Sequence, residues 1–155
     1  MILKELRIKN YKSIRNTSAF SVADLTTLVG KNESGKSAIL EALYKINPVE
    51  KDCTYNVLND YPRKLELDYE QGLIEDGEKI VFAKWLLSED DKNSITETIG
   101  EKALLSLEIQ TISTYNNQNY INAAISIPET IKHFIKKAAL SPEEAALYSQ
   151  TTIED

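Results

Sequence analysis

Apolar and polar residues alternate at the start of the chain, which predicts a β-strand with one buried face. Ile2, Leu6 and Ile8 point to one side, and charged residues occupy most positions on the other. A turn at Arg15–Thr17 would then lead into a second strand, Ser18–Val22. The N-terminal segment therefore predicts an antiparallel hairpin.

The next two apolar segments predict a strand and then a helix. Leu25–Val29 is a short apolar and β-branched run, which predicts a buried strand. Beyond it, apolar residues recur at helical spacing at Ile39, Ala42, Leu43 and Ile46. Asn47-Pro48 predicts the end of this helix, because the residue before a proline avoids helical angles.

The second half of the chain predicts strands and helices in alternation. Lys79–Leu87 reads as a strand, and Ser88 caps a helix that carries Asp91 at its third position and stops at Gly100. Two further strands, around the turn Asn116–Asn119, form a long hairpin with one buried side. The buried side is predicted from Leu105, Leu107, Ile109 and Thr111 on one strand and Ile121, Ala123, Ile125 and Ile127 on the other.

A helix is predicted after Pro128, with Ile131, Phe134, Ile135 and Ala138 on one face. Its other positions hold Lys132, His133, Lys136 and Lys137, which either meet a phosphate backbone or form a solvated face. Ser141–Glu144 is a further capping signal.

The segment Asp52–Gly77 is less regular, with a turn predicted at Asp60–Arg63 because proline fixes φ. Arg63 and Lys64 are candidates for contacting nucleotide or nucleic acid, or a solvated surface pair. The acidic residues that follow, up to Glu78, favour a solvated loop over a metal site, because their spacing matches no ligand motif.

Between the strand at 25–29 and the helix after it lies a glycine-bearing loop. Its residues are Gly30, Lys31, Asn32, Glu33, Ser34, Gly35, Lys36 and Ser37, which fill the pattern G-x-x-x-x-G-K-[ST] of a phosphate-binding P-loop. The two glycines permit backbone angles that turn the N–H groups inward as an anion nest, and the helix adds its positive end. Lys36 would reach the β- and γ-phosphates of a nucleotide, and the Ser37 hydroxyl would be a Mg²⁺ ligand.

Composition narrows the class of protein. The 155 residues, of which 42% are hydrophobic and 27% charged, suit one globular domain with a real core. No apolar run is long enough for a membrane helix, and Cys53, the single cysteine, suits a reducing cytoplasm. The formal net charge of -6 argues against nucleic-acid binding through overall charge, although a local basic patch stays possible.

The opening Leu3–Ile14, followed closely by a loop of the form G-x-N-x-S-G-K-S, resembles the RecF/SMC/OLD group of ABC-type ATPases. Asn32 is the matching asparagine. Many members carry glycine at the position of Glu33, and this departure is closer to OLD-type ATPases than to SMC proteins. The specific resemblance covers residues 1 to about 47.

The resemblance implies ATP and Mg²⁺ as ligands, with Lys12 and Ser13 near the adenine or ribose. It also implies a second ATPase head as partner, in a homodimer, together with DNA and a setting in DNA repair or anti-phage defence. A glutamine often supplies a second Mg²⁺ contact in this group, and the sequence does not choose among Gln71, Gln110, Gln118 and Gln150.

Other motifs of an ABC-type head do not occur in this sequence. None of the five glycines lies in a Ser-Gly-Gly signature, and no apolar strand ends in an Asp-Glu pair. The run Trp85–Asp90 is rejected as a Walker B strand, because Ser88 intervenes and its acids fall in the first turn of a helix. We therefore interpret residues 1–155 as the N-terminal part of an ATPase head.

The predicted fold is α/β, or α+β. It is a P-loop NTPase with the P-loop helix packed on a mixed sheet, and with an antiparallel β subdomain and helices over about residues 78–150. The favoured function is the ATP-binding half of an ATPase head, inactive in hydrolysis by itself. Two alternatives remain: a non-catalytic nucleotide-binding interaction module, and a kinase or GTPase of another P-loop branch. The last is weakest, because no Asn-Lys-x-Asp motif is present.

Overall fold

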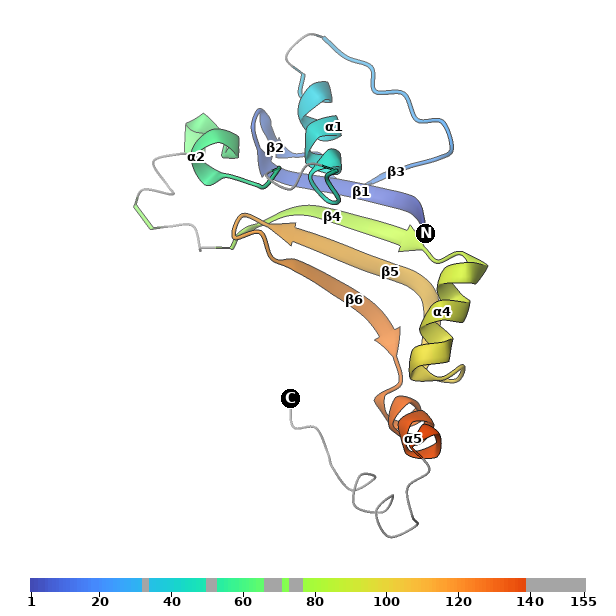
Figure 1. Ribbon diagram of the computed structural model, residues 1–155. Helices are drawn as coiled ribbons and strands as arrows, with labels where there is room; N and C mark the ends of the chain where they lie inside the picture. The colour runs from blue at the N-terminus through green and yellow to red at the C-terminus, as the bar shows by residue number, and fades with distance from the viewer. Residues whose placement is uncertain (32–33, 50–52, 66–70, 73–76, 139–155) are drawn as a thin grey trace. The chain divides into compact units, whose positions relative to one another are not determined.

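The computed structural model describes residues 1–31, 34–49, 53–65, 71–72 and 77–138 (Figure 1). The chain divides into two compact units. Unit 1 contains Met1–Ile2, Leu86–Ile109 and Ala123–Asp155, and unit 2 contains Leu3–Trp85 and Gln110–Asn122. The two units are described separately.

Six strands form one sheet in the order β2-β1-β4-β5-β6, and β3 also pairs with β1. Their bounds are β1 (Ile2–Tyr11), β2 (Ile14–Asn16), β3 (Phe20–Ser21), β4 (Lys79–Leu86), β5 (Leu104–Thr114) and β6 (Asn119–Ile125). Figure 1 shows β5 and β6 as the neighbouring arms of a hairpin, as the sequence predicts. The predicted strand after residue 79 is confirmed as β4.

The N-terminal hairpin is confirmed, but the position of its turn is wrong. β2 and β3 both pair antiparallel with β1, with Tyr11 opposite Ile14 and Leu6 opposite Phe20. The chain reverses at Lys12–Ser13 instead of at residues 15–17. Lys12 adopts a left-handed φ of 51°, which closes a two-residue turn that the sequence pattern did not signal.

The alternation of β1 changes phase at Asn10. Leu6 and Ile8 are buried as predicted, and Tyr11 is buried too although it is three residues further on. Asn10 has a left-handed φ of 46°, which makes the backbone of the strand irregular at this position. Its side-chain amide donates to a carboxylate oxygen of Glu78 at 2.6 Å, which holds this irregular backbone in place.

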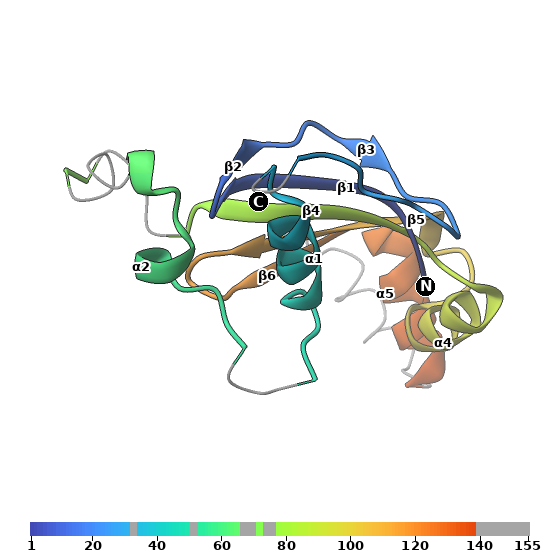
Figure 2. The same ribbon diagram turned by 90° about the horizontal axis from the view of Figure 1, so that it is seen from above.

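The core of unit 2 lies between the sheet and the helix after the P-loop. Figure 2 shows this helix, α1 (Lys36–Tyr44), lying over β4. Its residues Ala38 and Ala42 are buried in one cluster with residues of β1, β2 and β4. The predicted stripe is confirmed, because Ile39, Leu43 and Ile46 also pack against this cluster. Four buried tyrosines complete the cluster, namely Tyr11, Tyr55, Tyr61 and Tyr115. Two short elements missed from the sequence follow, α2 (Val57–Asp60) and η1 (Arg63–Leu65).

The predicted buried strand at residues 25–29 is wrong. The segment forms no strand, and Leu25 and Val29 are 87% and 88% exposed. A strand is buried only when neighbouring strands pair with it, and none of the described strands does so here. The apolar side chains of this segment are therefore uncovered in the described part of the structure.

In unit 1, the predicted capping box is confirmed. The helix α4 (Glu89–Ile99) begins after Ser88, whose hydroxyl accepts the N–H of Asp91, while the Asp91 carboxylate accepts the N–H of Ser88 at 2.9 Å. Gly100 forms the C-cap, as expected.

The helix α5 (Ile127–Lys137) confirms the helix predicted around Pro128. The capping signal at 141–144 lies outside the described residues.

The buried side predicted for the β5–β6 hairpin is wrong over most of its length. Ile109 is buried, but Leu105 and Ile121 are 66% and 68% exposed. An apolar sheet face is buried only where a second layer covers it, and the described residues supply no such layer over these side chains.

No helix in the described part of the chain is long and apolar enough to cross a membrane.

Candidate nucleotide-binding site

The end of the glycine-bearing loop has the geometry that its two glycines require. Gly35 is the N-cap of α1, with a φ of 90° and a ψ of 6°, a left-handed conformation that residues with a Cβ avoid. A Cβ at Gly35 would lie 3.0 Å from Cγ1 of Ile14, and a Cβ at Gly30 would lie 2.7 Å from Oγ of Ser34. Gly35 therefore requires glycine for its backbone angle and has little space for a Cβ. The close contact at Gly30 is with the end of an exposed serine side chain, which can rotate away.

The N-terminus of α1 is open to an anion. No acidic residue occurs in its first turn and, among the described residues, no side chain caps it. By contrast, α4 fills its own N-terminus with a capping serine and three acidic residues, Glu89, Asp90 and Asp91. The unpaired N–H groups and the positive end of the helix dipole make the start of α1 a binding position for phosphate.

The Lys36 side chain folds back over the loop. Its ammonium donates to the carbonyl oxygens of Gly30 at 2.8 Å and Lys31 at 2.6 Å, and lies 3.5 Å from Oγ of Ser34. These partners are exposed groups, so a phosphate could replace them without leaving buried polar atoms unpaired. The ammonium thus lies beside the open helix terminus, where the P-loop pattern predicts it.

The remaining loop residues divide into two groups. Lys31, Ser34 and Ser37 are exposed, whereas Asn32 and Glu33 lie outside the described residues. Ser37 lies in the first turn of α1 and its hydroxyl is open to solvent, which fits one protein ligand of a nucleotide-bound Mg²⁺. In the described ranges no cluster of three or more His, Cys, Asp or Glu residues is arranged to hold a metal ion.

The turn after β1 brings the other two predicted residues beside the loop. Oγ of Ser13 lies 3.3 Å from the position that a Cβ would take at Gly35. Lys12 forms an ion pair with Glu41 of α1, at 2.6 Å between Nζ and Oε1. The structure therefore places Lys12 and Ser13 next to the P-loop and its helix. Their contact with the adenine or ribose stays a prediction.

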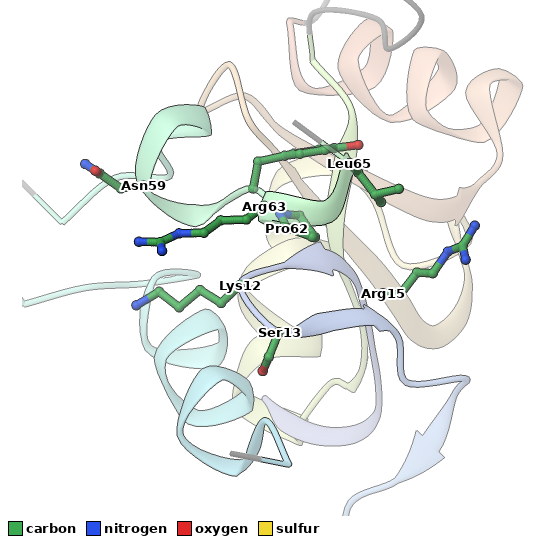
Figure 3. A pocket seen from close by; sticks show the side chains of 8 residues that line it. Lys12, Ser13, Arg15, Asn59, Pro62, Arg63 and Leu65 are labelled. Atoms are coloured by element: carbon green, nitrogen blue, oxygen red, sulfur yellow. The ribbon is translucent and has the colours of Figure 1, made fainter. Parts of the chain in front are cut away.

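A pocket opens beside this turn. It has a volume of about 690 Å³ and is lined by Lys12, Ser13, Arg15, Asn59, Tyr61, Pro62, Arg63 and Leu65. Figure 3 shows Lys12, Arg63 and Asn59 extending to one side and Arg15 to the other. The candidate Arg63 thus shares one pocket with Lys12 and Ser13, which are 51 and 50 residues away in sequence. The side chain of Lys64 lies outside the described part of the chain.

The wall of this pocket is held by side-chain contacts that the sequence did not predict. The hydroxyl of Tyr61 donates to Oε2 of Glu78 at 2.8 Å, and Asn10 donates to the other oxygen of the same carboxylate. Glu78 therefore orients Tyr61. Both oxygens of its carboxylate accept hydrogen bonds from protein side chains, so this last residue of the acidic stretch has a structural role. The stretch's residues at 66–70 and 73–76 lie outside the described residues.

Comparison with known proteins identifies the family. A family model described as an AAA ATPase domain matches residues 1–154. The chain belongs to this family. The match includes the P-loop, α1 and the pocket-lining segments, so all the geometry described above lies within the AAA ATPase domain.

Two curated relatives of this AAA ATPase domain are named for nucleotide chemistry. An "ATP/GTP phosphatase" of Helicobacter pylori is 28% identical over 124 residues, which cover 80% of this chain and 32% of the relative. A "DNA double-strand break repair Rad50 ATPase" of Archaeoglobus fulgidus is 28% identical over 149 residues, covering 88% of this chain and 16% of the relative. This chain thus spans about a third or less of their lengths. The Rad50 similarity confirms the resemblance to the RecF/SMC/OLD group.

A solved structure is similar as well. It comes from work on the ATP-driven dimerisation and DNA-stimulated activation of SMC ATPases. The two chains align with a TM-score of 0.44 and 15% sequence identity, over 100% of this chain and 87% of the other.

The rejected Walker B candidate of this AAA ATPase domain is indeed a helix cap. The carboxylate of Asp91 accepts from Ser88 and from the N-terminal ammonium of Met1, at 2.5 Å for the latter. The hydrogen bond from the N-terminal ammonium, and then those from Ser88, lower the pKa of Asp91 to about 2. Asp91 is therefore a carboxylate that stabilises the start of α4 in unit 1.

Two of the glutamines considered as Mg²⁺ contacts lie in the β5–β6 hairpin. Gln110 and Gln118 form hydrogen bonds within it, to Asn122 and Tyr120 respectively, and Gln150 lies outside the described residues.

Proposed function

We propose that this chain binds ATP–Mg²⁺ at Gly30–Ser37 and forms the nucleotide-binding part of an ABC-type ATPase head. One observation carries the proposal. The P-loop ends in a left-handed Gly35 at the open N-terminus of α1, with the Lys36 ammonium folded beside it. This combination offers backbone donors, a helix dipole and one side-chain cation to the same anion.

In the proposed complex, each group has a separate role. The N–H groups between residues 32 and 37 donate to the β-phosphate, and Lys36 exchanges its loop carbonyls for β- and γ-phosphate oxygens. Ser37 binds the Mg²⁺, which neutralises phosphate charge. Ser13 and Lys12 lie at the pocket into which the nucleoside would extend, because Ser13 adjoins Gly35.

Hydrolysis would need groups beyond these. A carboxylate must orient the attacking water, and charge on the γ-phosphate must be stabilised in the transition state. Among the described residues, Glu41 of α1 has a carboxylate with a defined position, and it is paired with Lys12. We therefore expect residues 1–155 alone to bind ATP without appreciable turnover.

The exposed segment around Leu25 and Val29 supports a larger head. Burial of two such side chains is worth about 1.5–3 kcal/mol each, so their exposure is unfavourable unless another strand covers them. We propose that the longer protein supplies the neighbouring strands, a Walker B acid and a signature motif. We also propose that a second copy of the head closes over the nucleotide, in a cytoplasmic homodimer.

The biological setting is proposed from the relatives. The name of the Archaeoglobus relative refers to DNA double-strand break repair, and by analogy we propose a role in DNA repair for this chain. The resemblance to the RecF/SMC/OLD group adds anti-phage defence as the alternative setting. DNA contacts would come from cations of the β subdomain or α5. Lys132 is paired with Glu129 at 2.6 Å, so Lys136 and Lys137 are the better candidates. Such binding should weaken steeply between two salt concentrations in a gel-shift titration, and salt-insensitive binding would count against it.

A second function is supported by the lack of a catalytic acid among the described residues near the loop. The chain would then be a nucleotide-binding interaction module, in which ATP acts as a conformational ligand. Turnover by the full-length protein would exclude this reading, and nucleotide-dependent partner binding without turnover would favour it.

Calorimetry with ATP–Mg²⁺ tests the proposal. Lys36→Ala removes a charge-assisted contact and should weaken binding by roughly 10- to 150-fold. Lys84→Ala is the matched control, because this lysine is exposed and pairs with Glu5, outside the loop. Equal affinity in the wild type and Lys36→Ala would contradict the proposed site. Phosphate release by residues 1–155, lost in Lys36→Ala, would show that this chain is a complete enzyme.

A further inference from the structure

The end of α1 that is distant from the P-loop is held by a buried ion pair. Lys45 directly follows α1, and its Nζ lies 2.7 Å from Oδ2 of Asp60, the last residue of α2. The two side chains are only 8% and 4% exposed. Buried ion pairs contribute little net stability, because desolvation offsets most of their attraction. This pair therefore points to a role in orientation.

Aromatic rings enclose the lysine. Its Nζ lies 5.5 Å from the ring centre of Tyr11 and 5.6 Å from that of Tyr55, at the distances of cation–π contacts. The Tyr55 hydroxyl donates to the carbonyl of Ala42 in α1 at 2.9 Å. Burial, and then the charge of Asp60, raise the pKa of Tyr11 far above its usual value, so its ring stays neutral. Lys45 thus has a fixed direction toward Asp60.

Asp60 connects this pair to the pocket. Its carboxylate accepts the N–H of Asn56 at 3.0 Å as well as Lys45, and its carbonyl accepts the N–H of Lys12. The residues on both sides of it, Asn59 and Tyr61, line the pocket, as does Lys12. Lys12 carries the left-handed φ of 51°, a conformation that persists only where its surroundings determine it.

We propose that Lys45 and Asp60 are a positioning pair that sets the pocket wall relative to the P-loop helix. One end of α1 starts in the phosphate loop, and the other end is bound through Lys45 to the segment that forms the wall. A nucleotide must reach both places at once, so its affinity depends on their separation. This inference rests on the proposed nucleotide site. It adds that the Lys45–Asp60 pair aligns the P-loop with the pocket.

A ligand that lacks a nucleoside separates this role from general stability. Inorganic tripolyphosphate needs only the P-loop and Lys36, whereas ATP needs the P-loop and the pocket. Loss of the pair should displace the pocket wall and leave the conformation of the P-loop unchanged. Gly35 and Lys36 do not contact Lys45 or Asp60 in any described interaction. ATP binding should then weaken while tripolyphosphate binding persists.

The experiment measures both dissociation constants by calorimetry, with Mg²⁺ present, in four proteins. Lys45→Met removes the charge and keeps the length, and Asp60→Asn keeps the shape and removes the opposite charge. Circular dichroism shows which variants stay folded, and only folded variants are compared. Lys84→Met is the control, because it deletes an exposed pair with Glu5 in the same unit. We expect ATP to weaken about tenfold or more in the first two, tripolyphosphate to change less than about threefold, and the control to match the wild type.

Each other outcome has a defined meaning. Equal weakening of both ligands in Lys45→Met and Asp60→Asn would overturn the positioning role, since the pair would then only support the fold. Unchanged ATP affinity in either folded variant would overturn it as well. A wild type that binds tripolyphosphate but not ATP would contradict the pocket's role in this inference while leaving the P-loop intact. A wild type that binds neither ligand would overturn the proposed function itself, and with it the inference.

Discussion

Substituting Gly35 by alanine should reduce both stability and nucleotide affinity, for reasons that the structure separates. The first is backbone strain, because Gly35 has a φ of 90°. The second is space, because the new Cβ would lie 3.0 Å from Cγ1 of Ile14 and 3.3 Å from Oγ of Ser13. Ile14 is buried in the core of unit 2, so it has little freedom to move away.

The expected size follows from adding these two terms. A left-handed conformation costs a residue with a Cβ roughly 1–2 kcal/mol. Forcing one extra carbon against a packed side chain adds about 1–3 kcal/mol. We therefore expect the free energy of unfolding to fall by roughly 2–5 kcal/mol. If the loop relieves the contact by moving, the shift of a few tenths of an ångström also displaces the phosphate donors.

Urea unfolding followed by tryptophan fluorescence is a suitable assay. Trp85, the single tryptophan, lies in the same unit as Gly35, with its indole N–H donating to Oγ1 of Thr111 at 2.8 Å. Gly72→Ala is the control, because Gly72 has a φ of 68° but no atom of the described residues lies within 4 Å of the added Cβ. It should lose only the backbone term of about 1–2 kcal/mol. The reasoning is refuted if Gly35→Ala is as stable as Gly72→Ala, or binds ATP–Mg²⁺ like the wild type.

The remaining predictions concern packing, capping and pH. Ile8→Ala should lower the free energy of unfolding by about 2–5 kcal/mol, because the side chain is fully buried; a loss below that in urea titrations would mean that the core relaxes. Thr111→Val should cost about 1–3 kcal/mol and alter Trp85 emission, because the indole N–H loses its acceptor; unchanged emission would contradict this contact. Ser88→Ala should cost about 1 kcal/mol and speed hydrogen exchange in the first turn of α4, and unchanged exchange would argue against the cap. The folded-state pKa of Asp91, about 2, is below its ordinary value of 3.8, so its stabilisation is present above 3.8 and is lost as pH falls through 2. The stability difference between the wild type and Asp91→Asn should therefore shrink over this range, and a constant difference would disagree with the assignment.

Features that depend on neighbouring residues in the chain could be predicted from the sequence. The P-loop and α1 follow from the spacing of Gly30, Gly35 and Lys36 and from the apolar stripe beyond them. The capping box of Ser88 and Asp91 is likewise local, because a hydroxyl and a carboxylate three residues apart can reach each other's N–H groups only at a helix start. These interactions close within one or two turns, so the sequence alone determines them.

Only the tertiary structure decided how distant segments meet. Nothing in the sequence connects Lys45 with Asp60, or Lys12 with Arg63, because the turn at Lys12 and the short helix α2 are set by the core on which they pack. Burial is decided in the same way. Leu25 and Leu105 carry the apolar pattern of buried positions, yet they are exposed, because a pattern specifies which face can be covered and a neighbouring layer must still cover it.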